Sequence, residues 1–188
     1  MPPPIMPPPL ETKVAAVDLS GVDDEGTFSG YASLFGTADL SGDIVMPGAF
    51  LRSIAARRAS GIRMLYQHDP AEPIGVWLDI REDPRGLLVR GRLTLDVARG
   101  REVASLMRAG ALDGLSIGFR TVRARADRAA GVRRLTEIDL WEISVVTFPM
   151  QPQARVASVK GRQARSLAQQ MRRAAHSLNS RTTKRIAK

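Results

Sequence analysis

The sequence predicts an α+β fold in which about seven largely antiparallel strands form a β-barrel or a strongly bent sheet, with two or three flanking helices. Segments whose apolar residues alternate recur between short turns, which is typical of strands that bury one face. Helical patterns are few and do not alternate regularly with the strands. The 188 residues, 44% hydrophobic and 25% charged, suit one well-packed domain.

The N-terminal part is expected to hold a leader and two strands. Residues 1–11 form a Pro-rich leader, since six prolines among the first nine residues exclude a helix interior or a central strand. Strands follow over Thr12–Leu19 and Phe28–Phe35. A Gly/Asp-rich turn at Gly21–Gly26 separates them, so we expect them to pair as a hairpin.

A loop, a short helix and a third strand come next. The loop is expected over Gly36–Gly48 and the helix over Ala49–Arg58. Ile62–His68 is expected to be a strand that ends in a turn at Asp69–Pro70. Its alternate residues share one face: Ile62, Met64, Tyr66 and His68.

A second hairpin and the clearest helix follow. Strands over Ile74–Arg81 and Gly86–Thr94 flank a turn at residues 82–85. The helix is expected over Ala98–Arg108, with Gly110 as its stop signal. Its apolar stripe consists of Val103, Leu106 and Met107.

Two more strands complete the domain, which we place at residues 12–157. They are expected over Leu115–Ala126 and Thr136–Phe148. Residues 158–188 are predicted to form a basic amphipathic tail. Its apolar stripe includes Leu167, Met171 and Leu178.

The net charge of +9 is carried by the end of the chain. From Arg155 to Lys188 there are 10 Lys/Arg and no Asp or Glu, which leaves 28 − 10 = 18 basic against 19 acidic residues before them. The domain is therefore nearly neutral, which argues against specific nucleic-acid binding. The tail alone suits an acidic protein surface, or non-specific nucleic-acid binding.

Several classes of function are disfavoured by residues that the chain lacks. It contains no cysteine and two histidines, so we expect no disulfide, no metal site and no cofactor. No apolar run is long enough to span a bilayer, and the leader does not resemble an export signal. We therefore expect a soluble protein that is not exported.

His68 is the candidate general base, because the other histidine, His176, lies in the tail. Imidazole is the side chain best suited to proton transfer near neutral pH. A lone histidine on an apolar strand face is also the pattern of a packed core residue. The residues alone leave both interpretations open.

Ser116 and Glu142 are the other candidates. Ser116 is bracketed by Gly114 and Gly118, and such glycines let a substrate approach and let amides face an oxyanion. A solvent-facing strand serine has the same pattern. Glu142 is expected to share its strand face with mainly apolar residues, Leu140 among them, so its carboxylate needs a partner, either in catalysis or as an ion pair with an arginine.

Five stretches together carry a resemblance to a known family. They are GYASLF at Gly30–Phe35, DIVMPGAF at Asp43–Phe50, YQHD at Tyr66–Asp69, LDGLSIGF at Leu112–Phe119 and LWEISVVTFP at Leu140–Pro149. In this order and spacing they resemble the prohead proteases of the HK97-type tailed phages. That family is related in fold to the herpesvirus assemblins.

The resemblance implies a serine endopeptidase with Ser116 as nucleophile and His68 as base. Assemblins place a second histidine as third member on a strand that follows the serine. Glu142 lies 26 residues after Ser116, at a similar offset, and is therefore preferred to Asp69 or Asp139. Arg155, after the last strand, is a weaker candidate for binding the oxyanion.

The resemblance also implies partners and a location. The substrate would be the major capsid protein or its scaffolding segment, and the chain itself could be cut. Cleavage would occur in the host cytoplasm, inside assembling proheads of a phage or of a gene transfer agent. Assemblins act as homodimers, and the basic tail would dock on capsid or scaffold.

Two alternatives from other classes remain open. One is a non-catalytic capsid scaffold or assembly protein that retains the protease fold. The other is a nucleic-acid-binding module, which the neutral domain and few aromatic residues disfavour.

Overall fold

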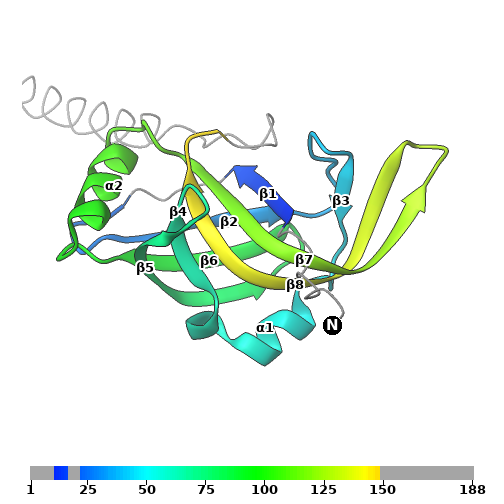
Figure 1. The fold of residues 1–188 in the computed structure, drawn as a ribbon, viewed down its shortest axis with the longest axis horizontal. Helices are drawn as coiled ribbons and strands as arrows, with labels where there is room; N and C mark the ends of the chain where they lie inside the picture. Colours follow the sequence, from blue (N-terminus) through cyan, green and yellow to red (C-terminus); the bar gives the residue numbers. More distant parts are fainter. Residues whose placement is uncertain (1–10, 17–21, 149–188) are drawn as a thin grey trace, which may run out of the picture. The chain divides into compact units, whose positions relative to one another are not determined.

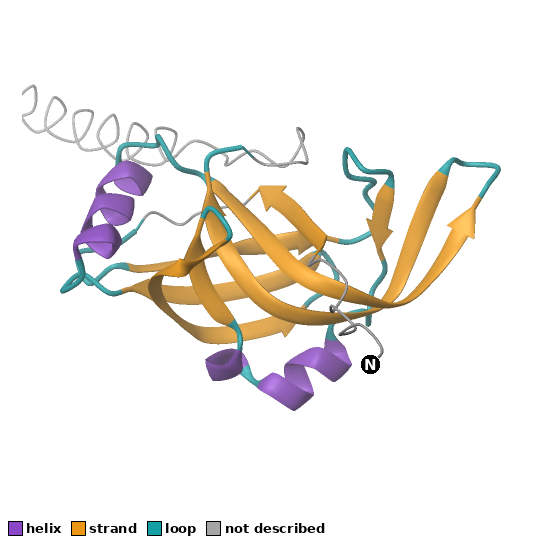
Figure 2. Ribbon diagram, viewed as in Figure 1, coloured by secondary structure: helices purple, strands orange, loops and turns teal. Residues whose placement is uncertain are grey.

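The computed structural model describes residues 11–16 and 22–148 (Figures 1 and 2). The predicted leader up to residue 10, the tail and Arg155 lie outside these residues. The helices and strands are β1 (Glu11–Ala16), β2 (Thr27–Leu34), β3 (Asp43–Val45), α1 (Leu51–Arg57), a 3₁₀ turn (Ala59–Gly61), β4 (Arg63–Tyr66), β5 (Asp69–Glu82), β6 (Gly86–Leu93), α2 (Ala98–Arg108), β7 (Gly114–Asp127) and β8 (Val132–Val146).

The strands form one curled sheet, as predicted. Seven of the described strands follow the order β1-β7-β8-β4-β5-β6-β2, and the short β3 joins β8 beside this path. Five of the pairings are antiparallel, while β3 and β4 run parallel to β8. Figure 1 shows the sheet bending into a partly closed barrel, with α1 and α2 outside it. The predicted α+β class with a bent, largely antiparallel sheet is confirmed.

One predicted hairpin is confirmed and the other is wrong. β5 and β6 pair across the short turn that separates them. β1 and β2 do not pair with each other, because β1 pairs with β7 and β2 pairs with β6. Both strands therefore pair with strands that are distant in the sequence, which a local turn signal does not reveal.

The end of β4 also differs from the prediction. β4 stops at Tyr66, and Gln67 and His68 form the turn to β5 with φ values of 53° and 63°. His68 therefore lies in a tight turn rather than on the strand, and the turn comes before Asp69 rather than at Asp69–Pro70. Most turns of this kind contain a glycine, and the sequence has none at residues 67 and 68, so the pattern did not signal this turn.

The two helices are anchored in different ways. The Glu82 carboxylate accepts hydrogen bonds from the N–H groups of Gly48 and Phe50, both 2.7 Å, and so fixes the entry to α1. α2 has the predicted bounds and buries Val103, Ala104 and Met107. Leu106, predicted on the buried stripe, is 40% exposed.

The hairpin of β7 and β8 supports the site and extends beyond it. Its ladder runs from Gly114 opposite Val146 to Asp127 opposite Val132, and its far end projects as an arm (Figure 1). β8 begins four residues before the predicted Thr136. Within the described ranges, none of the helices has the length and hydropathy needed to cross a membrane.

Candidate active site

His68 and Glu142 are in direct contact. His68 Nδ1 lies 2.6 Å from Glu142 Oε1, although 74 residues separate them in the chain. The parallel pairing of β4 with β8 brings them together, and the Gln67 N–H donates to the Val145 carbonyl at 3.0 Å. The Glu142 side chain is 9% exposed and that of His68 is 26% exposed.

Ser116 lies on the same face of the sheet as Glu142. In the β7–β8 ladder, Ser116 is opposite Ser144 and Gly118 is opposite Glu142. Side chains that are directly opposite in an antiparallel pair share a face, with Cβ atoms about 5 Å apart. The fold therefore gathers all three predicted site residues in one region.

Ser116 is fully buried rather than facing solvent. The two residues beside it on β7, Leu115 and Ile117, are also fully buried and face the core. The Ser116 side chain therefore has no contact with solvent in this structure.

A bulge at Trp141 places Glu142 on a different face of β8 from the one that the sequence predicts. Gly118 pairs with Glu142 but the next residue, Phe119, pairs with Leu140, which leaves Trp141 without a partner in the ladder. Leu140 consequently shares the core-facing side with Phe119, while Glu142 points to the opposite side. The prediction that these two residues share a face was wrong, yet Glu142 is buried and needs partners as expected.

Gly118 provides the space that the Glu142 carboxylate occupies. A Cβ atom at Gly118 would lie 2.1 Å from Glu142 Oε1 and 2.8 Å from its Cδ. Both are far inside van der Waals contact. Sequence reasoning assigned the glycines around Ser116 to substrate approach, whereas the contact of Gly118 is with Glu142.

Ser144 is a polar member of this region that sequence reasoning did not single out. Its hydroxyl lies 2.6 Å from Glu142 Oε2, and the backbone N–H of His68 donates to Ser144 Oγ at 3.2 Å. Glu142 and Ser144 are two polar residues at alternate positions of a mostly apolar strand. This spacing of two polar residues was the feature of the sequence that could have identified Ser144.

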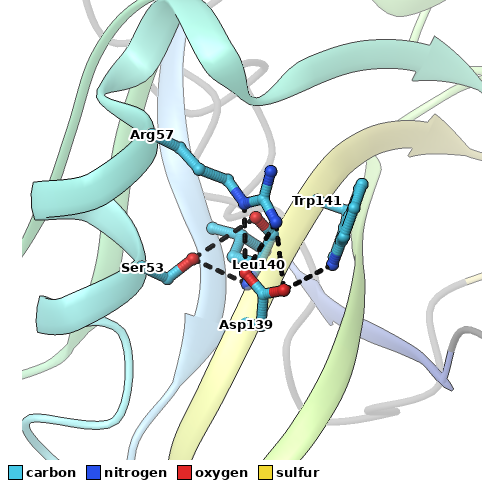
Figure 3. Close-up of polar contacts among 5 residues, drawn as sticks. All are labelled: Ser53, Arg57, Asp139, Leu140 and Trp141. Carbon is cyan, nitrogen blue, oxygen red and sulfur yellow. Dashed lines mark hydrogen bonds and ion pairs between the residues drawn. The ribbon is translucent and has the colours of Figure 1, made fainter.

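The alternative third members have other partners. Asp139 accepts hydrogen bonds from Arg57 Nε and Nη2 at 2.9–3.0 Å and from Trp141 Nε1 at 2.8 Å (Figure 3). Asp69 accepts from the Ala71 N–H at 2.8 Å and supports its own turn. Glu142, whose other expected partner was an arginine, bonds instead to His68 and Ser144.

The described residues do not suggest a metal centre. Among residues 11–16 and 22–148, no three His, Asp or Glu side chains gather closely enough to hold an ion. The functional groups of this region are the hydroxyls of Ser116 and Ser144, the imidazole of His68 and the carboxylate of Glu142.

Comparison with known proteins identifies sequences of the same kind. The chain matches the sequence model of the family described as caudovirus prohead serine protease over residues 11–170. It is 36% identical over 146 residues to the prohead protease of Enterobacteria phage HK97, covering 77% of this chain and 64% of that protein. It is 26% identical over 141 residues to the prohead protease of Escherichia phage T5, covering 74% and 66%. The chain thus spans just under two thirds of these relatives.

A solved structure shares the fold. The capsid assembly protease of bacteriophage T4 superposes with a TM-score of 0.61 at 15% identity, covering 75% of this chain and 98% of that one. At this identity the likeness concerns the fold alone.

Proposed function

The chain belongs to the caudovirus prohead serine protease family, and we propose that it is a serine endopeptidase that cleaves capsid or scaffold protein during prohead maturation. The main support is the 2.6 Å contact between His68 Nδ1 and Glu142 Oε1 on the face that also carries Ser116. A hydroxyl, an imidazole and a carboxylate are the parts of a Ser-His-acid triad. The relatives are named prohead proteases, which supports the substrate class.

In the proposed mechanism, His68 is neutral and carries its proton on Nδ1. An ionised carboxylate can only accept hydrogen bonds, so Nδ1 donates to Glu142 Oε1. His68 Nε2 then has a free lone pair. It takes the proton of Ser116 Oγ while that oxygen attacks the scissile carbonyl carbon.

The reaction then passes through an acyl-enzyme. Nε2–H of His68 gives its proton to the leaving amine as the peptide C–N bond breaks, which leaves an ester on Ser116. Water attacks the ester, and its proton passes through Nε2 back to Ser116 Oγ. The Glu142 carboxylate stabilises the imidazolium formed in both steps, and its burial limits screening by solvent.

Access to Ser116 is part of the same proposal. Because Ser116 is fully buried, cleavage requires an opening step before the chemical step. The substrate is the major capsid protein or its scaffolding segment, met inside the assembling prohead. A homodimer and docking by the tail also belong to this proposal, and deletion of the tail tests the docking.

The test is co-expression of the full chain with its cognate capsid protein. We expect the capsid band to shorten with the wild-type chain and to keep its length with Ser116→Ala or His68→Ala. A capsid band that stays full length with the soluble wild-type chain in assembled particles would favour the non-catalytic scaffold. Cleavage by the Ser116→Ala chain would reject the mechanism.

A further inference from the structure

We propose that Ser144 is a positioning residue of this site, whose single hydroxyl group fixes the positions of Glu142 and His68 relative to each other. This inference rests on the proposed function. Ser144 Oγ contacts the Glu142 carboxylate at 2.6 Å and the His68 backbone N–H at 3.2 Å. Ser144 thus contacts both His68 and Glu142 and also lies opposite Ser116 in the ladder.

The direction of both hydrogen bonds follows from the groups involved. The His68 N–H can only donate, so a lone pair of Ser144 Oγ accepts it. The ionised Glu142 carboxylate can only accept, so the single hydroxyl proton of Ser144 goes to Oε2. Ser144 is fully buried, so solvent offers its hydroxyl no competing partner.

The first consequence concerns the orientation of the Glu142 carboxylate. The last torsion of a glutamate side chain has a broad energy profile, so rotamer preference does not fix the plane of its oxygens. Two hydrogen bonds fix it here, from His68 Nδ1 to Oε1 and from Ser144 Oγ to Oε2. Without the hydrogen bond from Ser144, the carboxylate can rotate, and Oε1 no longer points at Nδ1 of His68.

The second consequence concerns the turn that carries His68. His68 adopts φ of 63°, a region that non-glycine residues seldom occupy. Its N–H is held by Ser144 Oγ, and the N–H of Gln67 is held by the Val145 carbonyl at 3.0 Å. Loss of the Ser144 hydroxyl removes one of these two restraints and moves the imidazole relative to Ser116.

The same contacts argue against Ser144 as a second nucleophile. Its proton is engaged by Glu142, and its hydrogen bond with His68 is to the backbone rather than to the ring. Ser144 therefore acts through its neighbours.

The test uses Ser144→Ala with Ser53→Ala as the matched control. Ser53 is also buried, and its hydroxyl accepts from the N–H of Leu140 on β8 at 2.7 Å (Figure 3). Both variants should lower the melting temperature. We expect Ser144→Ala alone to lower kcat, with KM within about twofold of the wild-type value. The expected decrease is about 10- to 100-fold, the range seen when residues that orient metal-binding side chains are replaced.

A double variant separates positioning from general destabilisation. Because Ser144 acts partly through Glu142, Ser144→Ala should lower kcat by a smaller factor in a Glu142→Gln background than in the wild type. Full multiplication of the two effects, or a Ser144→Ala kcat within about threefold of wild type, would overturn the inference.

A readout independent of activity distinguishes this inference from the proposed function. Amide hydrogen exchange at His68 should be slow in the wild type and at least about tenfold faster in Ser144→Ala, with Ser53→Ala unchanged. If the chain shows no peptidase activity but this exchange pattern holds, the proposed function fails and the positioning contact stands. Equal exchange in the wild type and Ser144→Ala would refute the positioning role whatever the activity.

Discussion

Gly118→Ala should abolish the proposed peptidase activity by displacing Glu142 rather than by unfolding the domain. The added Cβ would lie 2.1 Å from Glu142 Oε1. Normal contact between a methyl carbon and an oxygen begins near roughly 3.2 Å, so the carboxylate must move by about 1 Å. Backbone movement is the costlier response, because β7 is paired on both sides.

The displacement is enough to break the contact with His68. Oε1 lies 2.6 Å from Nδ1, and a shift of about 1 Å directed away from the imidazole would stretch this to about 3.6 Å, outside hydrogen-bond range. Loss of the group that orients the imidazole lowers the rate of triad enzymes by as much as about 10⁴-fold. We therefore expect kcat/KM to fall by roughly 10²- to 10⁴-fold, with a stability loss of about 1–3 kcal/mol from the unsatisfied carboxylate.

The assay combines cleavage of a capsid-derived peptide with thermal melting. Gly131→Ala is the matched control, because it strains a glycine with φ of 64° at the tip of the arm, where an added Cβ would meet nothing within 4 Å. It should lower stability while leaving kcat/KM near that of the wild type. A folded Gly118→Ala enzyme within about threefold of the wild-type rate would refute the role assigned to this contact.

Three further predictions concern Glu142, the tail and Asp83. Glu142→Gln keeps the shape of the side chain but loses its charge, so the catalytic rate of the folded protein should fall roughly 10²- to 10⁴-fold. A rate within about threefold of the wild-type rate would mean that another residue is the third member of the triad. Deletion of residues 159–188 should leave peptide hydrolysis intact and reduce incorporation of the chain into proheads. The reason is that the chain from Arg155 onward carries 10 basic and no acidic residues, which suits an acidic protein surface. Unchanged incorporation of the truncated chain would reject docking by the tail. Partial burial alone would raise the pKa of Asp83, but hydrogen bonds from Tyr31 at 2.5 Å and from the N–H groups of Arg85 and Gly86 hold that pKa below its usual value. The stabilisation is present above the unfolded pKa near roughly 4 and is lost as pH falls through the lower folded pKa, so the difference in melting temperature between wild type and Asp83→Asn should narrow from about pH 6 to about pH 3.

The elements that local pattern determines were predictable from sequence. α2 has the predicted bounds because its helical periodicity and the Gly110 stop lie within one segment. β5 and β6 were paired correctly because adjacent strands joined by a short turn usually pair. β1 was paired wrongly because its partner, β7, lies about 100 residues away and no local signal connects them.

The contact between His68 and Glu142 was predictable, but the backbone geometry around it was not. The resemblance proposed Glu142 as the partner of His68, and the two side chains are in contact. The positive φ of His68 and the bulge at Trp141 were not foreseen, because both are imposed by tertiary pairing. Ser144 was missed because its contact with His68 spans 76 residues and involves a backbone group.

The most direct test of the central claim is active-site labelling of the full chain with a fluorophosphonate. Only a hydroxyl activated by an adjacent base competes with water for such a reagent. We expect one adduct, mapped by mass spectrometry to Ser116, with a labelling rate that falls sharply in His68→Ala and Glu142→Gln and does not change with a chelator. An adduct on Ser144 or another serine, or a Ser116 labelling rate that is the same in all three proteins, would contradict the proposed triad.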